Sequence, residues 1–293
     1  GGVRMIAAVM LGSNGQGRHY RLANENDYTA VWKSQKHLQR MLEDWKRNGE
    51  EEPCPVPDEP LPLMSGTFNV PIYGMNQWGD LFTARQKVAI NILIALLRAD
   101  DGLKNRAVTE EVIALSLGKL LRHCNVVSKW HRGSETVAGA FGMQALPMSW
   151  DFPEMFPLVP YAGGFDDALH NVIEAVMTTA SSISTPGQVE TADAAEHPLP
   201  DETTSVWFTD PPYYFAIPYA DLSDFFYVWL KRALPAHTKL IDRFEPSNPL
   251  SHKKRGIYQS CPLAYNYLNP SVLVYPHSRR RNLGDDDTPR NLG

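Results

Sequence analysis

The tetrapeptide Asp210-Pro211-Pro212-Tyr213 constrains the fold of this chain more than any other feature of its sequence. It follows the apolar run 206–209 and precedes a segment, 221–234, whose apolar residues have helical spacing. Proline pairs interrupt regular structure, because each proline lacks an N–H group and has a fixed φ angle. The order therefore predicts a strand, a rigid loop and a helix, with Asp210 at the carboxyl end of the strand, where open α/β sheets bind ligands.

The residue types in this tetrapeptide suit the binding of an exocyclic amino group on a nucleobase. The Asp210 carboxylate and the Pro211 carbonyl can each accept one N–H, which localises the lone pair of the amino nitrogen. Pro212 stiffens the loop, and the Tyr213 ring offers a stacking face for an extruded base, a contact that contributes about 1–3 kcal/mol per base. Asp-Pro-Pro is also a common turn, so the four residues alone leave both interpretations open.

Longer strings around the tetrapeptide resemble a family of adenine-specific DNA methylases, large bacterial and archaeal proteins with an N-terminal domain of unknown function. The similar stretches are residues 209–230, 73–86 and 141–151, and the likeness covers most of residues 1–246. The resemblance implies S-adenosylmethionine as methyl donor and the N6 amino group of adenine in DNA as target. It also implies an α/β fold, a partial Rossmann-like methyltransferase with a largely helical insert.

The same resemblance implies roles for individual residues. The expected catalytic residues are Asp210, Pro211, Pro212 and Tyr213. Asp193, after the predicted strand 188–191, is expected to contact the adenine amino group of the cofactor, although a turn aspartate before a loop fits the position equally well. Three aromatic residues are expected to line the base pocket from the loop before the last helix: Tyr214, Phe215 and Tyr219.

Composition and spacing divide the chain into five parts. Residues 1–49 are expected to form a hairpin and a helix, and residues 50–66 a linker rich in proline and acids. Residues 67–165 are interpreted as the helical insert, where recognition of the DNA target is expected. Residues 166–246 are the catalytic α/β segment, and residues 247–293 an irregular tail, either disordered or translated from a shifted reading frame.

The first part contains a glycine cluster at 12–17 between two short segments, 5–11 and 18–22, that would form partner strands. Methyltransferases hold their cofactor on a glycine-rich turn, but no amphipathic helix follows this one, so a plain hairpin is favoured. Asn26 and Asp27 then predict the cap of a helix. Its apolar positions are expected to be core or interface: Val31, Leu38, Met41, Leu42 and Trp45.

Helical spacing predicts four further helices. A capping box at 83–86 opens one that extends to residue 97, and a second is expected over 109–130, with Leu117, Leu120, Leu121 and Cys124 on one stripe. A third, 165–183, is expected to face a sheet through Leu169, Val172, Ile173, Val176 and Met177. The last, 221–234, is expected to pack through Leu222, Phe225, Phe226, Trp229 and Ala233.

The remaining polar candidates are weaker. Arg85 is either a contact for a DNA phosphate or a solvated side chain at the start of a helix, and His123 and His131 are given no role. Cys54, Cys124 and Cys261 form no Cys-x-x-Cys pair, so neither a disulfide framework nor a zinc site is predicted.

The overall charge and the apolar runs limit the classes of partner. The net charge of −5 does not suit a protein that grips phosphates over its whole surface, although a local basic cleft would suffice for a methylase. The longest apolar run, 88–97, is too short to cross a bilayer, so no membrane partner and a cytoplasmic location are expected. The oligomeric state stays open.

The cofactor motif of the resembled family normally lies upstream of the tetrapeptide, and no such glycine-rich strand–turn–helix is visible here. The chain is therefore interpreted as a fragment that binds S-adenosylmethionine weakly and is inactive alone. Two alternatives stay open. Related motifs methylate cytosine N4 or a protein glutamine, and a non-catalytic DNA-binding or assembly remnant would also keep the tetrapeptide.

Overall fold

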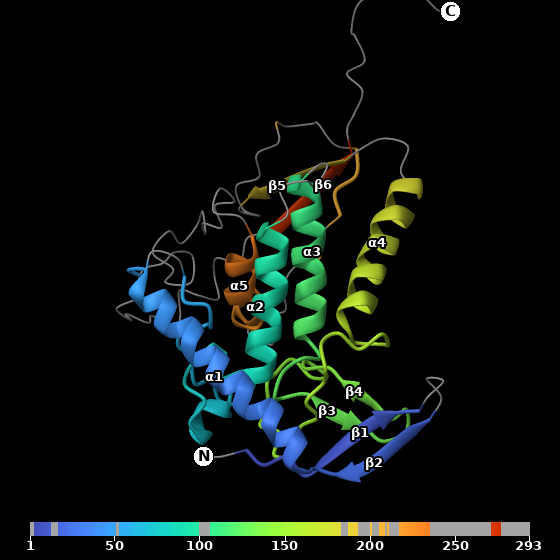
Figure 1. Cartoon of the computed structure of the whole chain (residues 1–293). Coiled ribbons are helices and arrows are strands. Elements are labelled where there is room, and N and C mark those ends of the chain that lie inside the picture. The colour runs from blue at the N-terminus through green and yellow to red at the C-terminus, as the bar shows by residue number, and fades with distance from the viewer. Residues whose placement is uncertain are drawn as a thin grey trace, which may run out of the picture. The chain divides into compact units, whose positions relative to one another are not determined.

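The computed structural model describes residues 3–12, 17–50, 53–99, 106–182, 187–192, 200, 205–208, 210, 217–234 and 271–276. The chain divides into two compact units, whose helices and strands are labelled in Figure 1. The first unit comprises Gly1–Val176 and Thr209–Asn269, and the second comprises Met177–Phe208 and Pro270–Gly293.

The first unit begins with the hairpin that its sequence predicts. Strands β1 (Ala7–Leu11) and β2 (Arg18–Leu22) are antiparallel, with Ala7 opposite Leu22 and Leu11 opposite Arg18. Gly17 has a φ angle of 76°, a left-handed conformation that glycine adopts at low cost. A strand and not a helix follows the glycine cluster, which confirms the hairpin over the cofactor-loop interpretation.

Helix α1 (Glu25–Arg47) starts one residue after its N-cap, Asn24. The Asn24 side chain accepts hydrogen bonds from the N–H groups of Asn26 and Asp27, and the Asp27 carboxylate accepts one from the Asn24 N–H. This reciprocal capping box places the cap two residues before the predicted Asn26. The helix packs against α2, and its predicted apolar positions are all partly buried: Val31, Leu38, Met41, Leu42 and Trp45.

Residues 53–62 contain no helix, as expected of an extended linker, but they lie against the protein. Cys54 and Leu61 are only 7% and 5% exposed, and Pro60 forms a bridge with Gln77. Two short 3-10 helices follow, η1 (Val70–Tyr73) and η2 (Trp78–Leu81). The proline-rich segment is therefore part of the packed structure.

Three helices form the centre of the first unit: α2 (Ala84–Ala99), α3 (Arg106–Leu121) and α5 (Tyr219–Ala233). Helix α2 packs against α3 and α5, and α3 packs against α5. The predicted capping box of α2 is confirmed, because Thr83 and Gln86 each bind the other's backbone N–H through a side-chain oxygen. All three helices contribute to one hydrophobic core, which includes Ile90, Ile94, Leu117, Leu120, Phe225 and Trp229.

Helix α3 ends at Leu121, well before the predicted end at residue 130. The side chain of Asn125 causes the break: its Nδ2 donates to the carbonyls of Leu121 and Arg122, at 2.8 and 3.0 Å, and its Oδ1 accepts from the Val127 N–H. Such bonds compete with the helical pattern. The predicted stripe is buried, although Cys124 lies beyond the helix. A short antiparallel hairpin follows, β3 (Lys129–His131) and β4 (Thr136–Ala138).

Helix α4 (Phe165–Ser182) has the predicted bounds but not the predicted packing. Leu169 and Val172 are partly buried, whereas Ile173, Val176 and Met177 are 40%, 50% and 66% exposed. The expectation that this whole face covers a sheet is therefore wrong. A sheet must have several strands to cover a whole helix face, and each sheet among the described residues has only two.

The second unit contains one antiparallel ribbon. Strand β5 (Gly187–Ala192) pairs with β6 (Ser271–Pro276), with Gly187 opposite Pro276 and Ala192 opposite Ser271. The predicted strand at 188–191 is confirmed. The interpretation of 247–293 as irregular is wrong for residues 271–276, because their pairing with β5 spans too much sequence to be read from local spacing.

The structure is thus α/β in composition, a set of helices with short antiparallel strands. Its described strands form three two-stranded sheets, β1–β2, β3–β4 and β5–β6. A parallel, Rossmann-like sheet is not among these strands, so that part of the fold stays a prediction. None of the described helices combines the length and the apolar character needed to span a membrane.

Candidate functional site

The described part of the chain contains two of the predicted site residues. Asp210 is exposed, which leaves its carboxylate accessible to a ligand. Tyr219 is 40% exposed and is the first residue of α5, so it belongs to the helix and not to the loop before it. The other predicted site residues lie outside the described part of the chain: Asp193, Pro211, Pro212, Tyr213, Tyr214 and Phe215.

The residues before the tetrapeptide differ from the prediction. Val206, Trp207 and Phe208 are not in a strand, and they are 77%, 48% and 91% exposed. A run of β-branched and aromatic residues favours a strand only where its side chains can pack on a neighbouring strand, and Val206 and Phe208 are largely exposed. The prediction that a strand over 206–209 carries Asp210 at its tip is therefore wrong for residues 206–208.

An aromatic cluster surrounds the helix that follows the tetrapeptide. Phe225 and Trp229 of α5 are fully buried, and Phe82 packs against both, with ring centroids 5.7 and 5.2 Å apart. The ring centroids of Trp78 and Phe225 are 6.4 Å apart, and the two rings meet edge to face. Each such pair stabilises the fold by about 0.5–1.5 kcal/mol beyond its area burial. The cluster confirms that the aromatic stripe of α5 is core.

Phe141 joins this cluster from a third segment. Its ring lies 5.2 Å from that of Phe225 and 5.5 Å from that of Phe226. Its φ angle is 64°, in the left-handed region that costs a bulky residue roughly 1–2 kcal/mol. The contacts with α5 offset this strain. The loop at 141 is therefore held in one conformation by its packing on the helix.

The three stretches for which the sequence predicts a likeness to a methylase family meet at α5. Trp78 and Phe82 belong to 73–86, Phe141 belongs to 141–151, and Phe225 and Trp229 belong to 209–230. No protein-family model, curated protein or solved structure matches this chain.

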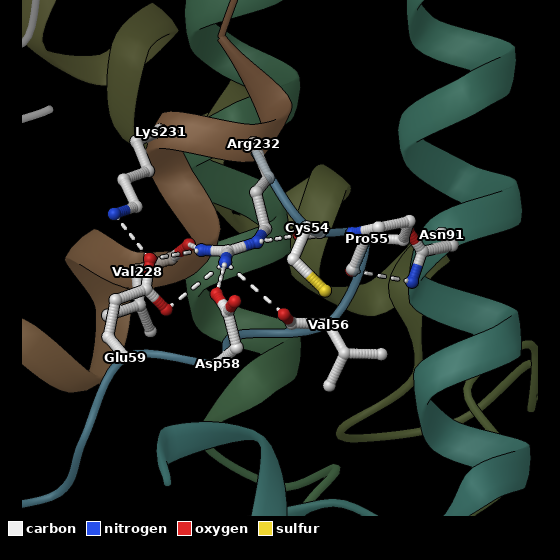
Figure 2. Close-up of polar contacts among 9 residues, drawn as sticks. All are labelled: Cys54, Pro55, Val56, Asp58, Glu59, Asn91, Val228, Lys231 and Arg232. Carbon is white, nitrogen blue, oxygen red and sulfur yellow. Dashed lines mark hydrogen bonds and ion pairs between the residues drawn. The ribbon is translucent and has the colours of Figure 1, made fainter. Parts of the chain in front are cut away.

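The other end of α5 is held by a buried ionic network (Figure 2). The Arg232 side chain is 4% exposed and lies between the helix and residues 54–59. Its Nε donates to the Cys54 carbonyl at 2.6 Å, and its two terminal nitrogens reach the Glu59 carboxylate at 2.9 and 3.1 Å. Lys231 also forms an ion pair with Glu59. A buried charge is tolerated only when paired and hydrogen-bonded in this way.

This network changes the ionisation of its acids. Burial alone would raise the pKa of Glu59, but Arg232 and Lys231 together hold it below its ordinary value. Burial raises the pKa of Asp58, and the negative charge of Glu59 adds to that effect. Glu59 is thus the carboxylate that neutralises the two cations, while Asp58 lies at the edge of the network, 3.4 Å from Arg232.

Arg98 of α2 binds the same end of α5. Its Nη2 donates to the Arg232 carbonyl at 2.6 Å, and so satisfies a carbonyl in the last turn of the helix. Arg106 in turn donates to the Arg98 carbonyl and forms an ion pair with Glu110. The end of α5 is therefore clamped by α2 as well as by residues 54–59.

Sequence reasoning missed this network, although one signal was present. Arg232 follows the buried Phe225 and Trp229 at helical spacing, so the pattern places a cation on the buried side of the helix. Such a cation requires a carboxylate. The acids of the proline-rich segment were available, but no local rule selects Glu59 among them.

The remaining polar candidates are structural in their contacts. Arg85 forms a two-pronged ion pair with Glu154, at 2.8 and 2.7 Å, so it is not free for a DNA phosphate. His123 is half-buried, and burial lowers its pKa. Cys54 and Cys124 are buried free thiols. Within the described ranges, no group of His, Cys, Asp and Glu residues is arranged to hold a metal ion.

Proposed function

We propose that this chain is part of an S-adenosylmethionine-dependent DNA methyltransferase that modifies the N6 amino group of adenine. The observation that carries the proposal is the meeting of the three family-like stretches in one aromatic cluster at α5. Stretches that belong to one family fold are expected to share a core. Their contact supports descent from a common fold.

In this proposal the tetrapeptide binds the target base. The Asp210 carboxylate and the Pro211 carbonyl accept the two N–H groups of the adenine amino group, Pro212 stiffens the loop, and Tyr213 stacks on the extruded base. The exposure of Asp210 supports this role, because a buried carboxylate could not meet a base. Tyr214, Phe215 and Tyr219 complete the base pocket, and Asp193 contacts the cofactor.

The proposed fold is a partial Rossmann-like methyltransferase in which 67–165 is the helical insert. S-adenosylmethionine supplies the methyl group. None of the described residues supplies a glycine-rich turn between a strand and a helix, and Asp193 is the residue that we propose as a contact for the cofactor. The clamp on Arg232 fixes the helix that follows the tetrapeptide.

A second candidate is a non-catalytic DNA-binding or assembly module. The exposed, non-strand conformation of Val206, Trp207 and Phe208 favours it, because an active methyltransferase would need a strand there to aim Asp210. Methylation of cytosine N4 or of a protein glutamine would use the same kind of tetrapeptide and differs only in the acceptor.

The test is methyl transfer to DNA that lacks modified bases. The whole chain is incubated with labelled S-adenosylmethionine at high concentration, and the digested DNA is searched by mass spectrometry for methylated bases. Because the chain is expected to bind S-adenosylmethionine weakly and to be inactive at ordinary cofactor concentrations, we expect only a low yield of N6-methyladenine at this high concentration, and we expect its loss in Asp210→Asn. Asp166→Asn, an exposed aspartate in the first turn of α4, is the matched control and should keep the activity.

Each other product identifies an alternative. N4-methylcytosine or a methylated glutamine in added protein would change the acceptor and keep the chemistry. DNA binding without any methylated product above the Asp210→Asn background would favour the non-catalytic module. Equal activity in Asp210→Asn and the unaltered chain would show that the tetrapeptide is not the site.

A further inference from the structure

Helix α1 carries a row of cations on its outer side. Lys33, Lys36 and Arg40 recur at intervals of three and four residues, which places them on one face of the helix, and all three are exposed. The side that packs toward the protein is formed by the partly buried positions Val31, Leu38 and Trp45. Lys33, Lys36 and Arg40 are called the α1 basic row below.

The acids of α1 leave most of this row without a negative neighbour. No Asp or Glu occurs between Asp27 and Glu43, and Asp27 is bound through both carboxylate oxygens to Arg21, at 2.6 and 2.8 Å. Beyond the row, Asp44 lies 3.2 Å from Arg47, and Glu43, one turn after Arg40, offsets the charge at that end only. The row therefore presents positive charge to solvent.

The chain as a whole has the opposite charge. Residues 1–42 contain six Lys or Arg and two acids, a formal charge of +4, so the remaining residues carry −9 of the total of −5. A local positive surface on an acidic protein attracts polyanions to one place. This uneven distribution of charge favours anion binding at one surface over non-specific binding across the whole protein.

We infer that the α1 basic row binds the sugar–phosphate backbone of duplex DNA. At 1.5 Å per residue the row extends over about 10 Å, a length of duplex that carries about six phosphate charges. A basic amphipathic helix can also bind an anionic membrane, but that requires a free apolar face. The apolar face of α1 packs against α2, so a phosphate-rich polymer fits better.

The choice of DNA among polyanions rests on the proposed function, whereas the position of the surface does not. The row extends the contact with DNA beyond the tetrapeptide, and it carries no base-specific group. It would therefore contribute affinity without sequence preference, through charge and counterion release.

The test measures DNA binding by fluorescence anisotropy, with the whole chain and a short labelled duplex, over a salt range of about 50–200 mM. The variant Lys36→Gln/Arg40→Gln removes two exposed charges from the row. We expect it to reduce the slope of log K against log salt by about 1.8, and by about 2.7 when Lys33→Gln is added. The control Lys129→Gln/Arg132→Gln removes two exposed charges elsewhere and should leave the slope unchanged.

Three results would overturn the inference. They are no binding to the duplex at low salt, equal affinity of the row variant and the unaltered chain, and an equal loss in the row variant and the control. Binding to vesicles of anionic lipid in place of DNA would also refute it. The readout involves no methyl transfer, so loss of binding in the row variant supports the row whatever the methylation assay gives, and the methylation assay tests the proposed function separately.

Discussion

Arg232 and Glu59 form a two-pronged ion pair between segments that are 173 residues apart, with nitrogen–oxygen distances of 2.9 and 3.1 Å. Both side chains are largely removed from solvent, at 4% and 11% exposed. Helix α5 extends from Tyr219, just after the proposed base-binding loop, to this pair. The ion pair therefore holds one end of the helix whose other end follows the candidate site.

Removal of Arg232 should destabilise the protein strongly. Arg232→Met would leave Glu59 buried with only Lys231 as its ion partner and would free the carbonyls of Cys54 and Val56. Loss of one partner of a buried pair costs about 3–5 kcal/mol, and we expect a loss in that range in urea unfolding. Lys36→Met, at an exposed position, should change stability by less than about 0.5 kcal/mol.

A double variant tests whether the loss comes from the pair itself. Glu59→Gln removes the carboxylate that both Arg232 and Lys231 bind, so the loss of stability in the double variant should be smaller than the sum of the two single losses. Strict additivity of the two single changes would show that Arg232 stabilises through packing alone.

Gly79 tests whether the proline-rich segment is packed in solution. A Cβ atom at Gly79 would lie 2.6 Å from the Pro57 carbonyl oxygen and 2.6 Å from Val56 Cγ1. The Gly79 N–H also donates to that Pro57 carbonyl at 2.7 Å, so the close approach is part of the structure. Gly79→Ala should cost about 1–3 kcal/mol in thermal or urea unfolding.

Gly142 is the matched control for this change. A Cβ atom there meets nothing within 4 Å, so Gly142→Ala should be nearly neutral. If both variants were equally stable, residues 53–62 would be a free linker, as composition alone suggests.

Local patterns were sufficient for much of the helical structure. The apolar period located α2, α4 and α5 to within a few residues, and the Thr83–Gln86 capping box marked the start of α2. These features depend on residues close in sequence. The hairpin β1–β2 was predictable for the same reason, since a glycine cluster separates two short runs.

The features that sequence reasoning missed depend on distant partners. Strand β6 pairs with β5 across about eighty residues, and the Arg232–Glu59 pair joins the end of α5 to the proline-rich segment. Residues 206–208 do not form the predicted strand for a related reason. The β propensity of their side chains depends on strand pairing and packing, which the local sequence does not specify. For the candidate site, the sequence supplied the tetrapeptide and the exposed Asp210, but not the clamp that holds the helix behind it.

Asn125 should be critical for the loop that ends α3. It is fully buried, its amide donates to two carbonyls, and its oxygen accepts from Val127 and Ser128. Asn125→Ala would leave the Val127 N–H without this acceptor and would remove one donor from the carbonyls of Leu121 and Arg122, although the Arg122 carbonyl keeps the Ala140 N–H. A buried group left unpaired costs about 1–3 kcal/mol. We expect a loss at the upper end of that range in urea unfolding, whereas Asn26→Ala, at an exposed position in α1, should have little effect. Equal stability of the two variants would contradict the role assigned to Asn125.

His123 should make the fold less stable in acid. Burial lowers its pKa, and Arg122 and the Lys119 ammonium act in the same direction, whereas Asp167 and the Lys119 carbonyl oppose the shift. Since its folded pKa lies below the unfolded value, the unfolded chain binds the proton more tightly. Stability is therefore fully present above the unfolded pKa and declines as the pH falls from that value toward the folded one.

A comparison with His123→Gln isolates this effect. Both proteins retain Asp58, Glu59 and the other acids, so the titration of those groups cancels in the difference between the two unfolding free energies. We expect the variant to gain stability relative to the unaltered chain as the pH is lowered from about 8 to about 5. A difference that stays constant over this range would show that the His123 ring is equally easy to protonate in the folded and unfolded chains, and that its burial carries no charge penalty.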